Sequence, residues 1–233
     1  MKKKVYFNWS TGKDSALALY YLQNDPSVEI GHLLTAVNTH FDRVSMHGLR
    51  RSLMETQIKE INIPFSTIEL PESPSMEAYE QIMTEKVQEL LNKGYTAAAF
   101  GDIFLEDLRQ YREKQLEKFG INTYFPLWKK DTKQLLHEFL NLGFKAIVIT
   151  VKSDLLDKSF VGRVIDADFI KELPKNVDPC GENGEFHTFC FDGPIFKNPI
   201  PFKIGETILK TYKNPSKDGE KEIGFWYCDL LPK

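Results

Sequence analysis

The sequence has 233 residues, 42% of them hydrophobic and 27% charged, with a formal net charge of −3. This composition is that of an ordinary soluble globular protein, long enough to bury a core in one large domain or two small ones. The negative charge argues against a broad nucleic-acid-binding surface, although it leaves room for a local basic groove.

The chain has three cysteines, Cys180, Cys190 and Cys228, and no closely spaced pair. An odd, scattered set of this kind argues against a disulfide framework or a structural zinc site and fits a reducing compartment. The basic start MKKK precedes too short an apolar run for a signal peptide, and no segment is long enough to span a membrane. We therefore expect a cytoplasmic protein without a membrane partner.

The first strand turns directly into the first helix. Residues 5–9 form an apolar run that predicts a buried strand, and apolar spacing over residues 13–22 predicts a helix. The intervening Ser10-Thr11-Gly12 presents free N–H groups and the positive end of the helix dipole, which favour phosphate. Gly12 allows close approach of a ligand, and Lys13 adds a mobile charge. A capped helix with a solvated lysine would explain these residues equally well.

Four more predicted strands follow, at residues 30–37, 65–70, 96–100 and 122–127, with helices at 49–60, 75–92 and from just after Asp102 to Phe119. Residues 38–48 form a polar loop. This alternation predicts an α/β fold, a Rossmann-like five-stranded parallel sheet with helices on both faces. Ligands bind at the carboxyl ends of such strands, so the loop at 10–15 lies beside Gly101-Asp102 if the fourth strand neighbours the first.

The pattern changes beyond Trp128. A helix at 132–141 and a strand at 146–151 extend the sheet or begin a second unit. Asp-Gly pairs at 192–193 and 218–219 lie between short strand-like runs and predict two hairpins. We expect a smaller C-terminal α+β domain with hairpins.

The densest polar cluster lies at residues 178–188 and reads DPCGENGEFHT. Taken singly, Cys180 fits a buried hydrophobe and His187 a partner of a backbone group, and turn chemistry alone accounts for the glycines. Together the carboxylates, thiol and imidazole favour a substrate site.

Several segments carry a family resemblance. STGKDS at 10–15 resembles the SGGxDS pyrophosphate loop of the N-type ATP pyrophosphatases, the adenine nucleotide alpha-hydrolase-like group, but Thr11 replaces a glycine, and a positive φ there would be costly. With RVSMHGLR at 43–50, FGDIFLEDLRQYRE at 100–113, PLW at 126–128 and CGENGEFHTFCFDGPIF at 180–196, the chain is similar to the diphthine–ammonia ligase family.

The resemblance implies an ATP-binding domain over residues 1–128 and an acceptor-substrate domain over 129–233. It implies ATP and Mg²⁺ as cofactors and an AMP-forming amide synthesis, in which ATP adenylates the carboxylate of diphthine on elongation factor 2 and ammonia displaces AMP. Diphthamide-forming members read EGGE, an aromatic residue, then ET, whereas this chain reads ENGEFHT, with Asn183 and His187. The acceptor therefore stays open between a modified protein such as elongation factor 2 and a small acid, as does a homodimer.

The resemblance also suggests which residues act. Nucleotide binding falls to Ser10, Thr11, Gly12, Lys13, Asp14, Ser15, Val37, His47, Gly101 and Asp102. Val37 would meet the adenine edge through its backbone.

The catalytic candidates are Lys13, Asp14, Glu182, Glu185 and His187, the last three for the ammonia step. Asp14 is also the metal candidate, or simply a favourable charge in the first helical turn. Asp102 fits a metal ligand or a helix N-cap. The cations His47, Arg50 and Arg112 would stabilise the α-phosphate or lie on solvated helix faces.

Two other functions compete with this one. A tRNA-modifying, thiolating pyrophosphatase would need a CxxC or paired catalytic cysteines and a basic surface, which the sequence lacks. A non-catalytic adenine nucleotide sensor would need neither the Lys-Asp-Ser loop nor a second polar cluster.

Overall fold

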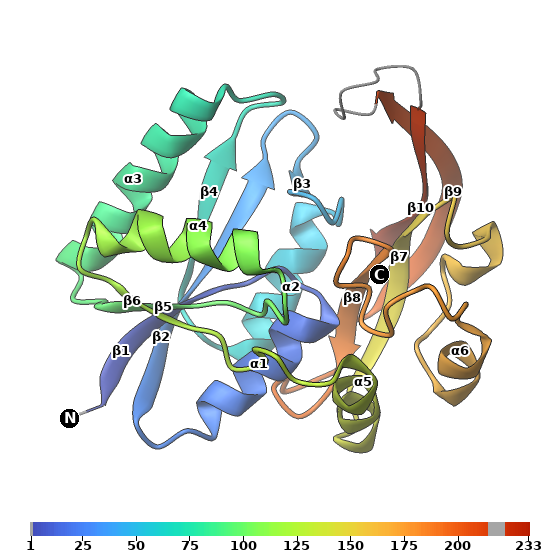
Figure 1. Cartoon of the computed structure of the whole chain (residues 1–233), viewed down its shortest axis with the longest axis horizontal. Coiled ribbons are helices and arrows are strands. Elements are labelled where there is room, and N and C mark those ends of the chain that lie inside the picture. The colour runs from blue at the N-terminus through green and yellow to red at the C-terminus, as the bar shows by residue number, and fades with distance from the viewer. Residues whose placement is uncertain (1, 214–221) are drawn as a thin grey trace.

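The computed structural model describes residues 2–213 and 222–233 and contains two β-sheets with helices between and around them (Figure 1). The strands are β1 Lys3–Asn8, β2 Val28–Asn38, β3 Arg43–Val44, β4 Phe65–Leu70, β5 Ala97–Ala99, β6 Asn122–Tyr124, β7 Lys145–Lys152, β8 Phe186–Asp192, β9 Phe202–Lys213 and β10 Glu222–Pro232. The helices are α1 Lys13–Gln23, α2 Arg51–Ile61, α3 Met76–Asn92, α4 Glu106–Glu117, α5 Thr132–Asn141, the 3₁₀ turn η1 Lys158–Phe160 and α6 Ala167–Glu172.

The first sheet confirms the predicted parallel, Rossmann-like arrangement. Strands β4, β2, β1, β5 and β6 lie side by side and all pair in parallel. Strand β5, made of three alanines that are fully buried, lies beside β1, so the strand order reverses between these two. A sixth strand, β3, adds antiparallel pairs to the end of β2 within the predicted polar loop.

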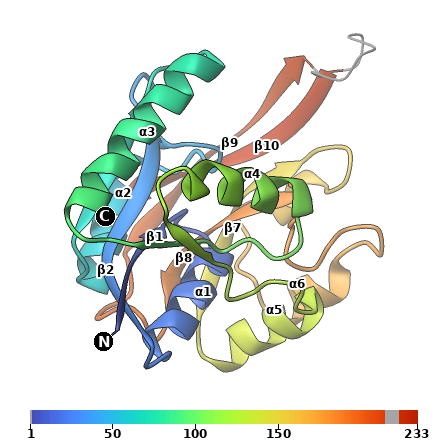
Figure 2. The same ribbon diagram turned by 60° about the vertical axis from the view of Figure 1, so that its left-hand side comes forward.

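The two faces of this sheet are covered differently. Helices α3 and α4 cover one face, while α1 and α2 lie between the two sheets (Figures 1 and 2). The larger hydrophobic core lies between the two sheets and includes Leu17 of α1, Leu53 of α2 and Phe189 of β8. A smaller core lies under α3 and α4. Across the described ranges no helix has the length and apolar character needed to cross a membrane.

The second sheet is antiparallel, in the order β8-β7-β10-β9. The predicted pairing of residues 208–213 with 222–228 is confirmed, since Ile208 faces Tyr227 across β9 and β10. The turn expected at 218–219 lies outside the described residues. The hairpin predicted at 192–193 is wrong, because β8 pairs with β7 and residues 195–196 are not in a strand. Gly193 instead passes so close to the Phe144 ring that a Cβ would collide with it.

Two further boundaries differ from the prediction. Helix α4 begins at Glu106 with Leu105 at its N-cap, so Asp102 does not cap it. The strand expected at 122–127 ends at Tyr124, where the chain enters a turn closed by the bond from the Trp128 N–H to the Phe125 carbonyl. Residues 100–105 therefore form a loop at the carboxyl end of β5, beside the loop that follows β1.

Candidate nucleotide and acceptor site

The loop between β1 and α1 is held in a conformation that threonine rarely adopts. Thr11 has a φ of +74°. A positive φ is costly for threonine, which stands here in place of the glycine of the SGGxDS loop. Its carbonyl accepts hydrogen bonds from the Gln57 side chain at 3.0 Å and from the Cys190 N–H at 2.9 Å. Gln57 in turn accepts one from the Trp9 indole at 2.8 Å. The surrounding network offsets the local strain, and Gln57 carries no signal in the sequence that would have revealed this role.

Gly12 lies against two segments that are distant in sequence. A Cβ on Gly12 would lie 3.1 Å from Cε1 of His47 and 3.3 Å from the Thr188 hydroxyl. The next N–H, that of Lys13, donates to the same Thr188 hydroxyl at 3.0 Å. Within the described residues the N–H groups of Gly12 and Ser15 have no protein acceptor, and both residues are buried at the start of α1, where helix N–H groups favour an anion.

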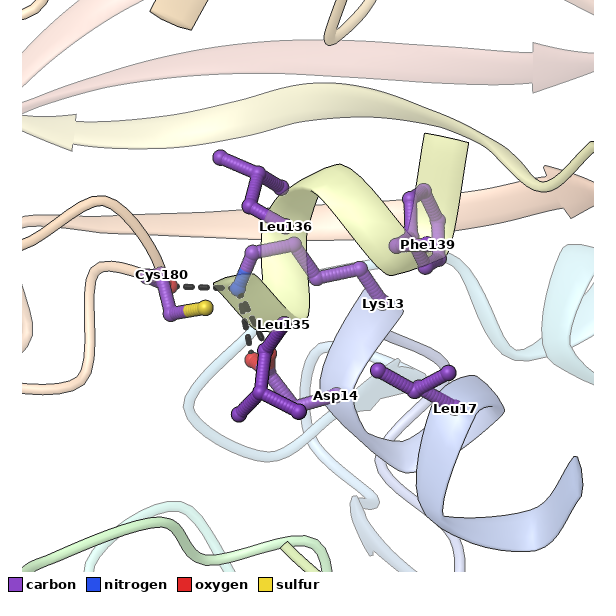
Figure 3. Close-up of a pocket in the computed structure, with 7 residues that line it drawn as sticks. All are labelled: Lys13, Asp14, Leu17, Leu135, Leu136, Phe139 and Cys180. Carbon is purple, nitrogen blue, oxygen red and sulfur yellow. Dashed lines mark hydrogen bonds and ion pairs between the residues drawn. The ribbon is translucent and has the colours of Figure 1, made fainter. Parts of the chain in front are cut away.

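The Lys13 side chain is buried, and the expectation of a mobile, solvated ammonium is wrong (Figure 3). Its Nζ donates to both carboxylate oxygens of Asp14, at 2.8 and 2.7 Å, and to the Cys180 carbonyl. Leu136 and Phe139 of α5 pack nearby. Burial alone would lower the pKa of Lys13, but the neighbouring acidic groups, Asp14 first among them, outweigh it and leave that pKa above its usual value. Lys13 therefore joins α1 to the 178–188 cluster as a buried cation.

The 178–188 cluster is a set of tight turns organised by Asp178. One carboxylate oxygen of Asp178 accepts from the N–H groups of Cys180 and Glu182, both at 3.0 Å. The other accepts from the Thr132 hydroxyl at 2.7 Å. Gly181 has a φ of +71°, and a Cβ there would meet Phe186 at 2.9 Å, so this turn requires glycine.

Glu182 reaches from this cluster to the loop after β5. Its Oε1 accepts hydrogen bonds from the N–H groups of Ile103 at 2.7 Å and Phe104 at 3.3 Å. Burial raises the pKa of Glu182 to about 7, and the negative charges of Asp14 and Asp102 act in the same direction. The carboxyl group thus lies where both loops and the cluster meet, and it titrates near neutral pH.

Glu185 and His187 lie in different surroundings from Glu182. Glu185 is 2% exposed. Its Oε1 accepts from the Asp178 N–H and the Asn183 amide, both at 3.0 Å, and its Oε2 has no hydrogen-bond partner among the described residues. His187 stacks on His47, with ring centroids 4.8 Å apart. Burial and the Lys13 charge lower the pKa of His187 to about 4, and burial also lowers that of His47, so both imidazoles are neutral at physiological pH.

The loops after β1 and β5 touch, as predicted. A Cβ on Gly101 would lie 3.1 Å from the Ser15 nitrogen. Asp102 pairs with Arg112 at 3.1 Å rather than capping a helix. Val37 is fully buried at the end of β2, where it lies opposite Val44 of β3 and Glu69 of β4.

The two arginines of residues 43–50 both form ion pairs within the protein. Arg43 and Arg50 pair with Asp229 of β10 at 2.9 and 2.6 Å. Arg43 also donates to the Gly48 carbonyl at 2.8 Å, which fixes the turn that carries His47. The sequence gives no signal for the role of Asp229, because its partners are nearly two hundred residues away. At the loop itself, the Ser10 N–H donates to the Ser15 hydroxyl at 3.1 Å.

Family comparisons agree with this arrangement. The family model of the diphthamide synthase N-terminal domain matches residues 2–123, and the model of the diphthamide synthase C-terminal domain matches residues 131–214. The chain belongs to the diphthamide synthase family. The predicted family resemblance is therefore confirmed.

Curated relatives of this family member are diphthine–ammonia ligases. The human enzyme is 30% identical over 111 residues, covering 45% of this chain and 42% of the relative. The Danio rerio enzyme is 34% identical over 104 residues, covering 42% and 39%. The Schizosaccharomyces pombe enzyme is 30% identical over 116 residues, covering 48% of this chain and 19% of the relative. The chain thus spans less than half the length of these relatives.

A U34-tRNA thiolase from Methanococcus maripaludis overlays on 60% of this chain and 57% of its own, with a TM-score of 0.38 and 17% identity. An overlay at that level says nothing further about function.

Proposed function

We propose that this diphthamide synthase family member is an ATP-dependent, amide-forming ligase. A carboxylate oxygen of the acceptor attacks the α-phosphorus of ATP, the α–β phosphoanhydride bond breaks, and pyrophosphate leaves. Ammonia then attacks the acyl carbon, the bond from that carbon to the AMP oxygen breaks, and AMP leaves. The nitrogen gives up a proton to yield the neutral amide.

The contact between the loop at 10–15 and the cluster at 178–188 carries this proposal. Thr188 bonds the Lys13 N–H, and the Cys180 carbonyl bonds the Lys13 ammonium. Glu182 meanwhile binds the loop after β5. A nucleotide on the first loop would therefore have its α-phosphate next to the polar cluster, as acyl transfer from an adenylate requires.

The phosphates would bind the start of α1. Within the described residues the N–H groups of Gly12 and Ser15 have no protein acceptor, and the helix dipole adds positive potential, whereas the Asp14 carboxylate offsets the Lys13 charge. Both oxygens of Asp14 face Lys13, and no group of three or more His, Cys, Asp or Glu side chains in the described residues is spaced to hold a metal ion. The residues present therefore fit Mg²⁺ only as an ion carried mainly by ATP phosphates, with Asp14 or Asp102 as an added ligand.

Glu182 is the best-placed base for the ammonia step. With a pKa near 7 it is partly ionised at neutral pH and can accept the proton that the attacking nitrogen releases. His187, neutral at that pH, would accept a hydrogen bond from ammonia. Glu185, which is buried, would order the turn through the Asp178 N–H and the Asn183 amide rather than contact the acceptor.

The cysteines do not favour thiolation. Burial raises the pKa of both Cys180 and Cys190, which keeps the thiols protonated and unreactive. A nucleotide sensor without catalysis is distinguished by the product assay below.

The test is a screen for acid-dependent AMP and pyrophosphate release in the presence of ATP and ammonium. The acceptors include elongation factor 2 from a diphthamide-making host and a panel of small acids, with each acid omitted as its own control. We expect AMP and pyrophosphate in equal amounts and one amide per AMP. ADP and phosphate as the main products would exclude the proposed reaction, and tight ATP binding without turnover for any acid would favour the sensor.

A further inference from the structure

Strand β9, Phe202–Lys213, is the outermost strand of the antiparallel sheet (Figures 1 and 2). Its partner in that sheet is β10. Among the described residues, none outside the sheet forms a hydrogen bond with the β9 backbone. The opposite edge strand, β8, is covered, because its Cys190 N–H donates to the Thr11 carbonyl and its Phe191 carbonyl accepts from the Ile200 N–H. The outer edge of β9 therefore presents backbone donors and acceptors that the described part of the chain does not use.

The side chains along this edge are apolar and exposed. Ile208, Leu209 and Tyr212 are 42%, 48% and 47% exposed. Strand alternation places Ile208 and Tyr212 on one face, which continues onto Phe225 and Tyr227 of β10, and Leu209 on the other. Both faces of the edge thus carry apolar surface, and no proline interrupts the strand. An edge strand of this kind pairs readily with another strand, and proteins normally cover it.

The charges on β9 indicate which strand covers it. Glu206 and Lys210 are exposed and lie two residues before and two residues after Ile208, on the same face. If two copies of β9 pair antiparallel about a two-fold axis at Ile208, Glu206 of each copy lies opposite Lys210 of the other. The two Ile208 side chains then meet at the axis. Opposite charges and apolar side chains that face each other across strands stabilise such a pair.

Neighbouring registers lack this complementarity. An axis at Lys210 would place the two lysines against each other, and an axis at Leu209 would place Lys210 opposite Ile208. A lysine on an edge strand normally discourages pairing, whereas the axis at Ile208 gives each lysine a carboxylate. We propose that two copies of this chain pair through β9 about a two-fold axis at Ile208, so that their antiparallel sheets become one continuous sheet. The inference does not depend on the proposed function.

The test is the oligomeric state in solution, measured by sedimentation equilibrium over a dilution series. The bulge in β9 opposite Asp229 lies at the start of the pairing segment, so the regular ladder is short and the dimer should dissociate on dilution. Ile208→Lys places two charges at the axis and should weaken the dimer at least tenfold. The matched control is Phe65→Lys, on the edge strand β4 of the other sheet, where Phe65 is 40% exposed. It should dimerise as the wild type does.

Charge reversal tests the register. Glu206→Lys places lysine opposite Lys210 at two symmetric positions and should weaken the dimer about tenfold. Adding Lys210→Glu to that variant restores opposite charges and should restore the wild-type dissociation constant. Within one strand the two residues are about 13 Å apart, so a restored dimer reports a contact between copies rather than within one.

A wild-type protein that stays monomeric across the series overturns the proposal, as does a dimer that Ile208→Lys leaves intact. Larger species without a defined mass would also overturn it, because they mark an unprotected edge that aggregates. A dimer that the double charge reversal fails to restore refutes the axis at Ile208. Circular dichroism checks that each variant is folded. If Ile208→Lys does not fold, the exposed Glu206→Lys must show the loss of the dimer by itself.

Discussion

Lys13 has both a structural and a candidate binding role. Its ammonium lies at a candidate phosphate site, and its aliphatic stem is buried in the core. Its side chain is 3% exposed and that of Asp14 is 28% exposed. Lys13→Met keeps the stem but leaves Asp14 without its cation, so we expect a loss of about 3 kcal/mol in the free energy of unfolding. The change is measured by urea denaturation. The matched control, Lys86→Met, breaks a surface pair with Glu89 and should cost under about 1 kcal/mol.

A double variant separates the structural role of Lys13 from its chemical one. Lys13→Met with Asp14→Asn leaves no unpaired charge and should regain most of the lost stability, yet AMP formation should stay impaired. Full activity in the stable double variant would show that neither charge takes part in the reaction.

The raised pKa of Glu182 makes the free energy of unfolding depend on pH, and the direction of that dependence can be worked out. Its pKa is about 7 in the folded protein, against an ordinary value of 4.5. Between these values the folded state holds a proton that the unfolded state has released, so this group makes stability fall as pH rises from about 4.5 to about 7. The total change is at most about 3 kcal/mol. Glu182→Gln should remove this decline, as followed by thermal melts across that pH range. Parallel curves for the two proteins would place the pKa of Glu182 at its ordinary value.

At the scale of elements, the turn at residues 43–50 depends on a partner that is distant in sequence. Asp229 of β10 holds both Arg43 and Arg50, and the turn they flank sets His47 against Gly12. Asp229→Asn should therefore raise the KM for ATP by about tenfold through misplacement of the loop, with a stability cost of about 1 kcal/mol. Steady-state kinetics at varied ATP measure the effect.

A second ion pair in the antiparallel sheet supplies the control. Asp192 pairs with Lys145 at 2.9 Å and has nearly the same exposure as Asp229, 24% against 23%, but does not contact the turn. Asp192→Asn should cost similar stability and leave the KM for ATP unchanged. Equal kinetic effects in both variants would make Asp229 a general structural residue.

Local sequence patterns predict those helices and strands whose positions are determined by residues close together in the chain. The apolar runs of β1 and β5 and the capped start of α3 at Ser75 follow from sequence because their signals lie within a few residues. The false hairpin at 192–193 shows the opposite case, since β8 takes its partner from β7, far along the chain. The burial of Lys13 was equally invisible, because the Cys180 carbonyl that holds it lies 167 positions away.

The whole molecule has one large core that both sheets share. Leu17, Leu53 and Phe189 belong to a single apolar cluster, so neither sheet buries its inner face alone. We expect one cooperative unfolding transition. Trp9 reports on the first sheet and Trp226 on the second, and single-tryptophan variants should give the same urea midpoint.

The division predicted at residues 128 and 129 can be tested in the same way. A fragment of residues 1–128 would expose the inner faces of α1 and α2 and should show no cooperative transition. Two separated midpoints in the full chain, or a stably folded fragment, would instead make the two sheets independent domains.

The contact of Thr188 with the loop has a consequence for how the protein is made. The hydroxyl that bonds the Lys13 N–H is synthesised 175 positions after Lys13, and the N–H that bonds the Thr11 carbonyl belongs to Cys190. On the ribosome, β1 and α1 emerge long before either partner exists. The loop at residues 10–15 is thus translated well before the residues that fix it, and it reaches its final shape only after they have been made.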